Sequence, residues 1–128
     1  NSYFFFSFFL FFFFVFFIFW IFFDLSIFKK ILNNILSILC IGISNASFHI
    51  AERTLLLWRG EYFVSLIAQQ RNIVLPSLYR YLIRSENVHW HPQVRVLANN
   101  VLKLFKSMDD GLYKREEKKY LNDRKRGV

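Results

Sequence analysis

SFHIAERTLLLWRGEYFVSLIAQQRNIVLPSLYRYLIRSENVHWHPQVRVLANNVLKLFKSMDDGL, residues 47–112, is the stretch that decides the fold of this 128-residue chain. It contains four apolar patterns of helical period and helical length, separated by short polar or glycine- and proline-containing segments. No segment alternates between apolar and polar residues with the period of a half-buried strand. We therefore expect an all-α fold without a sheet.

The first two predicted helices form an antiparallel hairpin. The first spans about 48–58, and its apolar face comprises Phe48, Ala51, Leu55 and Trp58. Ser47 is the expected N-cap, and Gly60 is expected to adopt the left-handed conformation that ends a helix. Glu61 begins the second helix, because a carboxylate suits the positive end of the helix dipole. Its apolar face comprises Tyr62, Phe63, Leu66 and Ile67.

The third and fourth predicted helices follow after a polar break. The third spans about 73–84 and tolerates Pro76 in its first turn, and residues 85–87 are expected to end it. Pro92 begins the fourth helix, whose apolar period is the clearest in the chain: Val94, Leu97, Val101, Leu104, Phe105, Met108 and Leu112. Asn100 is expected to lie near this face and to form a hydrogen bond with a loop between helices, because an unpaired buried amide is costly.

The length of the pattern indicates a stacking unit. From Phe48 to His91 is about one HEAT-like repeat, for which roughly 40–47 residues are typical. Such a helix pair has two apolar faces and buries both only by stacking on neighbours. We predict a fragment of a HEAT-like helical-repeat solenoid with three parts: a Phe-rich apolar segment at 1–43, the repeat and its capping helix at 44–113, and a basic tail at 114–128.

The Phe-rich segment has two interpretations. Fourteen of the 18 phenylalanines precede residue 24, and residues 3–23 are long and apolar enough for a transmembrane helix. Lys29 and Lys30 would then hold the rest of the chain on the cytoplasmic side. The bias towards Phe, Ser and Leu also marks low complexity, which translation of a pyrimidine-rich intron would produce. The alternatives are a membrane anchor and a mistranslated intron.

Composition argues against several classes of function. One cysteine, Cys40, excludes an internal disulfide framework, and the three histidines lack the spacing of a structural zinc site. No nucleophile has a base in a suitable context, and no glycine-rich phosphate loop is present, so we expect no enzyme, metal or cofactor. Residues 114–126 contain seven Lys or Arg against three acids. We interpret them as a solvated helix extension and expect no nucleic-acid binding, because no aromatic stacking platform accompanies them.

Several landmarks at fixed distances carry a family resemblance: residues 48–53 (FHIAER), Trp58, residues 61–62 (EY), residues 65–67 (SLI), residues 75–76 (LP), residues 89–90 (HW) and residues 100–108 (NVLKLFKSM). From Cys40 to about Lys119, their order and spacing resemble the C-terminal end of the B-prime (56 kDa) regulatory subunits of protein phosphatase 2A. Two departures are Arg59-Gly60, where the family usually has two asparagines, and residues 81–84, which are only loosely similar.

The resemblance implies a non-catalytic role. Members of this family are curved HEAT-like solenoids that bind the scaffold and catalytic subunits of the phosphatase and choose its phosphoprotein substrates. It implies a cytoplasmic or nuclear location within the phosphatase complex, with a membrane location only if residues 3–23 form a genuine span. Among exposed loop residues, Arg59, Glu61 and His89 are the expected contacts with a phosphatase subunit. The alternative function is that of a small membrane-anchored helical protein that recruits a partner.

Overall fold

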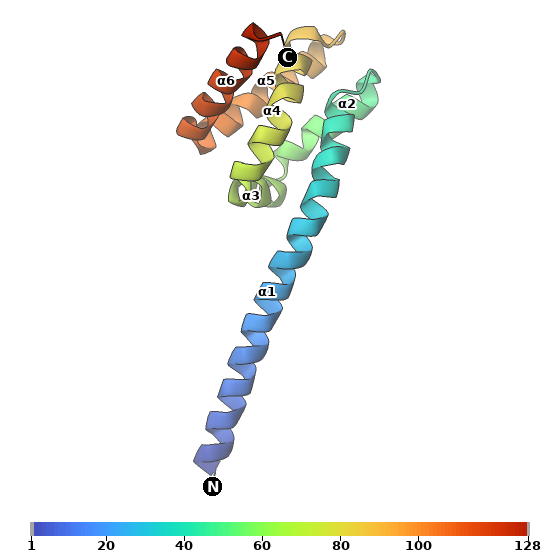
Figure 1. The fold of residues 1–128 in the computed structure, drawn as a ribbon. Helices are drawn as coiled ribbons and strands as arrows, with labels where there is room; N and C mark the ends of the chain where they lie inside the picture. The colour runs from blue at the N-terminus through green and yellow to red at the C-terminus, as the bar shows by residue number, and fades with distance from the viewer. Residues whose placement is uncertain (1, 128) are drawn as a thin grey trace. The chain divides into compact units, whose positions relative to one another are not determined.

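The computed structural model describes residues 2–127, apart from the side chains of residues 21–26 and 28. Within that range every regular element is helical, which confirms the predicted all-α fold (Figure 1). The chain divides into two units, Asn1–Ile35 and Leu36–Val128, and each is described by itself. The first unit consists of the greater part of α1 (Ser2–Ile43), whose last eight residues belong to the second unit.

In the first unit, α1 carries apolar side chains all around its axis. The side chains from Tyr3 to Trp20 that are large and apolar are exposed. Ser2–Trp20 is long and apolar enough to cross a membrane by length and composition. Signal sequences and the core helices of soluble proteins meet the same criterion.

The second unit contains the predicted helix pairs. After α1 follow α2 (Phe48–Leu56), the 3-10 turn η1 (Leu57–Arg59), α3 (Glu61–Gln69), α4 (Arg71–Val88), α5 (Pro92–Met108) and α6 (Asp110–Lys125). Helix α5 packs along α4 and against α2, and α6 packs on both α4 and α5 (Figure 1). The fully buried side chains that form the centre of this core are Ile43, Leu55, Val74, Leu75, Leu78, Leu82, Val94 and Phe105.

Trp58 confirms its predicted place in the core. It is buried in η1 and makes edge contacts with the rings of Phe63 and Phe105, at centroid distances of 5.2 and 6.2 Å. Aromatic pairs prefer this tilted arrangement, because the positive edge of one ring meets the negative face of the other. The indole therefore joins the η1–α3 corner to α5.

Two helix starts follow from local chemistry, and a third lacks the expected cap. At α5, Pro92 occupies the first turn, and Nδ1 of His91 accepts a hydrogen bond from the Gln93 N–H at 3.1 Å. At α6, Asp109 is the N-cap, and its Oδ1 accepts from the Leu112 N–H at 3.1 Å. At α2, the hydroxyl of Ser47 forms no capping bond, so the prediction for that side chain is wrong although the helix begins where expected.

Two predicted helix ends are wrong. Gly60 has φ −78° and ψ 120°, so the chain turns at the α2–α3 corner with an extended residue rather than a left-handed one. Residues 85–87 continue α4 to Val88, because Ser85 is buried and Glu86 accepts a hydrogen bond from the amide of Asn99 on α5. Tertiary packing overrides the weak helix propensity of this segment. The amide that joins two helices is thus Asn99, and Asn100 is exposed, contrary to prediction.

The predicted fourth helix is two helices. The chain leaves α5 at Met108, and Asp109, at φ −157° and ψ 90°, begins α6. Arg71 donates to the Asp109 carboxylate at 3.0 Å and so ties this junction to the start of α4. The hydrogen bond from the Leu112 N–H, followed by that from Arg71, lowers the pKa of Asp109.

Candidate interaction site

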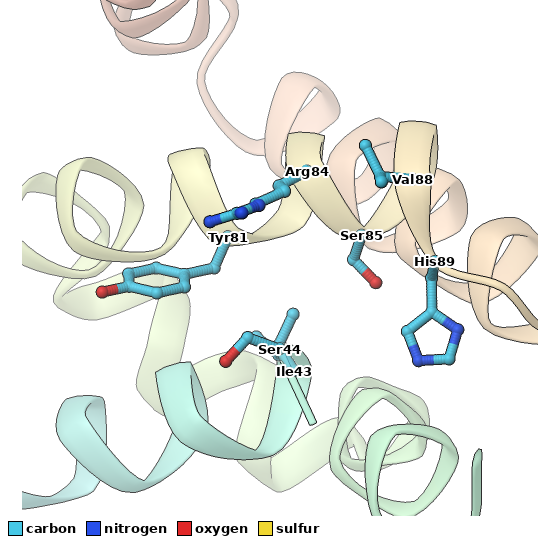
Figure 2. A pocket seen from close by; sticks show the side chains of 7 residues that line it. All are labelled: Ile43, Ser44, Tyr81, Arg84, Ser85, Val88 and His89. Atoms are coloured by element: carbon cyan, nitrogen blue, oxygen red, sulfur yellow. The ribbon is translucent and has the colours of Figure 1, made fainter. Parts of the chain in front are cut away.

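A hollow of about 310 Å³ lies between the end of α1 and the second half of α4 (Figure 2). Ile43 and Ser44 line it from the end of α1, and the remaining lining residues come from α4 and the residue after it: Tyr81, Arg84, Ser85, Val88 and His89. The sequence patterns did not predict this hollow, because α4 was expected to end before Ser85. The lining combines apolar side chains with a guanidinium, hydroxyls and an imidazole.

Ser85 is the unusual residue of this hollow. Its side chain is only 5% exposed, and its hydroxyl has no hydrogen-bond partner among the described residues. In Figure 2 the hydroxyl oxygen points from α4 towards the side occupied by Ile43 and Ser44. A buried hydroxyl without a partner costs about 1–3 kcal/mol.

A pair of hydrogen bonds joins the loop after α4 to the turn after α1. Nε2 of His89 lies 3.0 Å from the carbonyl oxygen of Asn45, and Nε1–H of Trp90 donates to the carbonyl oxygen of Ala46 at 2.7 Å. Nδ1 of His89 accepts from the His91 N–H at 3.1 Å, so the ring proton is on Nε2, where it can be donated to Asn45. We call these two bonds the loop clasp.

Ring stacking reinforces the loop clasp. The imidazole of His91 stacks on Phe48, the first residue of α2, with a centroid distance of 3.8 Å and an interplanar angle of 19°. Through the loop clasp, the His89-Trp90 pair packs the loop after α4 against the turn after α1. Trp90 remains 64% exposed, so its outer face is still free to contact other molecules.

The three predicted contact residues do not form one site. Arg59 and Glu61 are exposed at the corner between η1 and α3, where Tyr62 is also 79% exposed. His89 lies at the loop clasp, next to the start of α2, whereas Arg59 follows its end. The two places lie towards opposite ends of α2, whose nine residues are roughly 13 Å long.

Sequence reasoning placed Tyr62 on an apolar face and therefore missed it as a surface residue. Its position directly after Glu61, in the first turn of a short helix, could have indicated exposure. In α3 only Ile67 is buried. We call Arg59, Glu61 and Tyr62 the corner surface.

Cys40 has a packing role in this structure. Its Sγ–H donates to the carbonyl oxygen of Ser77 at 3.7 Å, and burial raises the pKa of the thiol. The protonated thiol is a weak nucleophile. In the part of the chain that the structure describes, no three His, Cys, Asp or Glu side chains converge as a metal site.

Comparison with known proteins gives a consistent result. The family model described as "Protein phosphatase 2A regulatory B subunit (B56 family)" matches residues 10–127. The chain is 38% identical over 81 residues to the B' epsilon isoform of the 57 kDa regulatory subunit of serine/threonine protein phosphatase 2A from Arabidopsis thaliana, covering 63% of this chain and 16% of that protein. It is 39% identical over 84 residues to the delta 2 isoform of the 56 kDa regulatory subunit from Schizosaccharomyces pombe. This match covers 66% of this chain and 13% of that protein.

The similarity to an animal relative covers more of the chain. Identity to the 56 kDa delta isoform of Homo sapiens is 32% over 102 residues, which cover 80% of this chain and 17% of that protein. The chain thus spans about one sixth of the length of these relatives. The resemblance described from the sequence patterns begins at Cys40. The match to the family model begins farther upstream, at residue 10.

Proposed function

Because the chain belongs to the B56 family of protein phosphatase 2A regulatory proteins, we propose that it acts as part of a non-catalytic regulatory subunit. In this role it contributes to binding the scaffold and catalytic subunits of the phosphatase, and through the parent protein it directs the choice of phosphoprotein substrates. The observation that carries the proposal is the family match over residues 10–127, and the stacked helix pairs of the second unit are consistent with it.

The corner surface is the place where we propose that a phosphatase subunit makes contact. Arg59 and Glu61 are exposed, and among the described residues neither side chain takes part in a hydrogen bond or an ion pair. Tyrosine and arginine are enriched in protein interfaces, because each combines a large apolar area with a polar end. We propose that His89 acts indirectly, through the position of the loop clasp.

Co-purification tests this proposal. The complete chain carrying an affinity tag is expressed in cells, and the recovered scaffold and catalytic subunits are quantified. Tyr62→Ala is expected to lower recovery several-fold, as truncation of an exposed interface aromatic does. Tyr3→Ala is the matched control, since Tyr3 is 82% exposed and lies in the other unit.

The two parts of the proposal fail separately. If the unaltered chain recovers neither phosphatase subunit, its own contribution to binding them is refuted. If the unaltered chain recovers both and Tyr62→Ala does so equally well, the corner surface is not the contact, and the regulatory role stands.

We also propose that the protein works in the cytoplasm or nucleus. The membrane-anchored alternative gains no support from the relatives, which are named as phosphatase regulatory subunits. Fractionation checks this location: the chain is expected in the soluble fraction, and retention in membranes after an alkaline carbonate wash would overturn the proposal.

A further inference from the structure

A second hollow, of about 540 Å³, lies between α4 and α6 and carries an unbalanced positive charge. Its lining residues are Arg80, Arg84, Asn87, Val88, Tyr120 and Arg124. Three of these six residues are arginines, and no carboxylate lines the hollow. We call it the arginine hollow.

The three arginines converge from two helices. Arg80 and Arg84 are four residues apart on α4, so they lie on one face of that helix, where like charges repel. Arg124 reaches the hollow from the last turn of α6. Figure 2 shows the Arg84 side chain extended along α4 towards its N-terminal side.

None of these guanidinium groups has an ion-pair partner among the described residues. Two acids, Glu116 and Asp123, line an adjoining hollow that Arg80 also borders, and the structure shows no ion pair between them and Arg80. An external anion would therefore relieve repulsion that the chain itself leaves in place.

Uncharged donors complete the site. Asn87 provides an amide, and Tyr120 provides a hydroxyl on a ring whose place is set by an edge contact with Tyr79 at 5.8 Å. A phosphoryl group carries about −1.5 to −2 charges and three acceptor oxygens, whereas a carboxylate carries one charge. Guanidinium forks match phosphate oxygens in geometry as well as in charge.

We propose that the arginine hollow binds a phosphorylated side chain of a protein segment. The volume lies within the roughly 300–1,000 Å³ typical of ligand pockets, which is enough for the phosphorylated residue together with part of its backbone. This inference deepens the proposed role in the choice of phosphoproteins by assigning a site, but the peptide test depends neither on that role nor on the corner surface.

The test measures peptide binding to the complete chain in an uncharged detergent by fluorescence anisotropy. The probe is a labelled Gly/Ser peptide with one central phosphoserine. Two comparison peptides, the partners of this probe in the assay, have unphosphorylated Ser or Asp at that position. The phosphorylated peptide is expected to bind about tenfold or more tightly than either partner.

Variants locate the binding. Arg84→Gln and Arg124→Gln are each expected to weaken binding of the phosphorylated peptide about tenfold, and Arg84→Lys to weaken it less, because charge remains but the fork is lost. Arg95→Gln is the matched control, since Arg95 is an exposed arginine on α5 that lines none of these hollows. Circular dichroism checks that the variants keep their helix content.

Three results would overturn the proposal. The first is no difference between phosphorylated and unphosphorylated peptides up to about 1 mM. The second is an equal loss of affinity for Arg84→Gln and Arg95→Gln, which would mean that net charge alone attracts the peptide. The third is tighter binding of a single-stranded oligonucleotide at the same arginines, which would indicate a nucleic-acid surface instead.

Discussion

Two valines on one helix provide a sharp test of the core. Val94 and Val96 are two positions apart on α5, yet Val94 is 0% exposed and Val96 is 54% exposed. Val94→Ala removes the equivalent of two buried methylene groups, at about 0.8 kcal/mol each, and leaves a small cavity. We therefore expect it to lower the free energy of unfolding by about 2–3 kcal/mol.

Val96→Ala is the matched control. At an exposed helix position alanine has the higher helix propensity, by about 0.5 kcal/mol, and this offsets the partial loss of apolar contact. The expected change in the free energy of unfolding is within about 0.5 kcal/mol of zero. For a unit of this size the loss of about 2–3 kcal/mol expected for Val94→Ala corresponds to about 8–24 °C in Tm.

The assay is urea unfolding of the complete chain, followed by far-UV circular dichroism. Helix α1 adds a constant background that both variants share, and equal m-values show that the same surface is exposed in each. Equal destabilisation by the two substitutions would refute the packing of α5 between α2 and α4. A larger effect at Val96 would mean that the helix presents its other face to the core.

The remaining predictions concern single contacts. A Cβ atom on Gly42 would lie 2.9 Å from Cγ2 of Thr54. Gly42→Ala is therefore expected to lower stability in urea unfolding despite the better helix propensity of alanine, and adding Thr54→Ala to the same chain is expected to restore it. A double variant that is no more stable than Gly42→Ala would contradict the close approach. Because the pKa of Asp109 is lowered, its charge stabilises the fold above about pH 4, and this contribution is lost as the pH falls through the folded-state pKa. The difference in stability between the unaltered chain and Asp109→Asn is therefore expected to shrink below about pH 4. A difference that stays constant with pH would show that the charge does not stabilise the fold. Trp90→Phe removes the donor to Ala46 and is expected to cost about 0.5–1.5 kcal/mol and to speed amide exchange in residues 45–47; unchanged exchange there would show that the loop clasp does not hold the turn.

Helix existence and helix starts were predictable from the sequence. Phe48, Glu61 and Pro92 begin helices as expected, and helix-dipole and proline effects are local to Glu61 and Pro92. The third expected start is wrong, because α4 begins at Arg71 and Pro76 lies inside the helix rather than in its first turn. Leu97 and Val101 were assigned to the core from the helical period of the apolar residues alone, and both are buried as expected. The family resemblance, which rests on fixed spacings, is likewise confirmed.

Helix ends and polar partners were less predictable, because distant residues decide them. Nothing local to Ser85 shows that it will be buried, and the choice between Asn99 and Asn100 depends on where Glu86 lies on another helix. The break at Asp109 is hidden by an apolar period that continues from Met108 to Leu112. Both hollows need α4 and a second helix to be placed together, so no sequence pattern could locate them.

The loop clasp also has a consequence for how the length of this chain can change. Insertions are tolerated where backbone groups are exposed and free of distant partners, and the backbone carbonyls of Asn45 and Ala46 both have such partners. An added residue at 45–47 or 89–91 would pull these partners apart, whereas the backbone hydrogen bonds of Gly60 join it to Leu57 and Val64, its near neighbours in the chain. At the end of the helix pair that we propose contacts a phosphatase subunit, a residue added beside Gly60 therefore breaks no distant hydrogen bond, provided that Trp58 keeps its contact with Phe105.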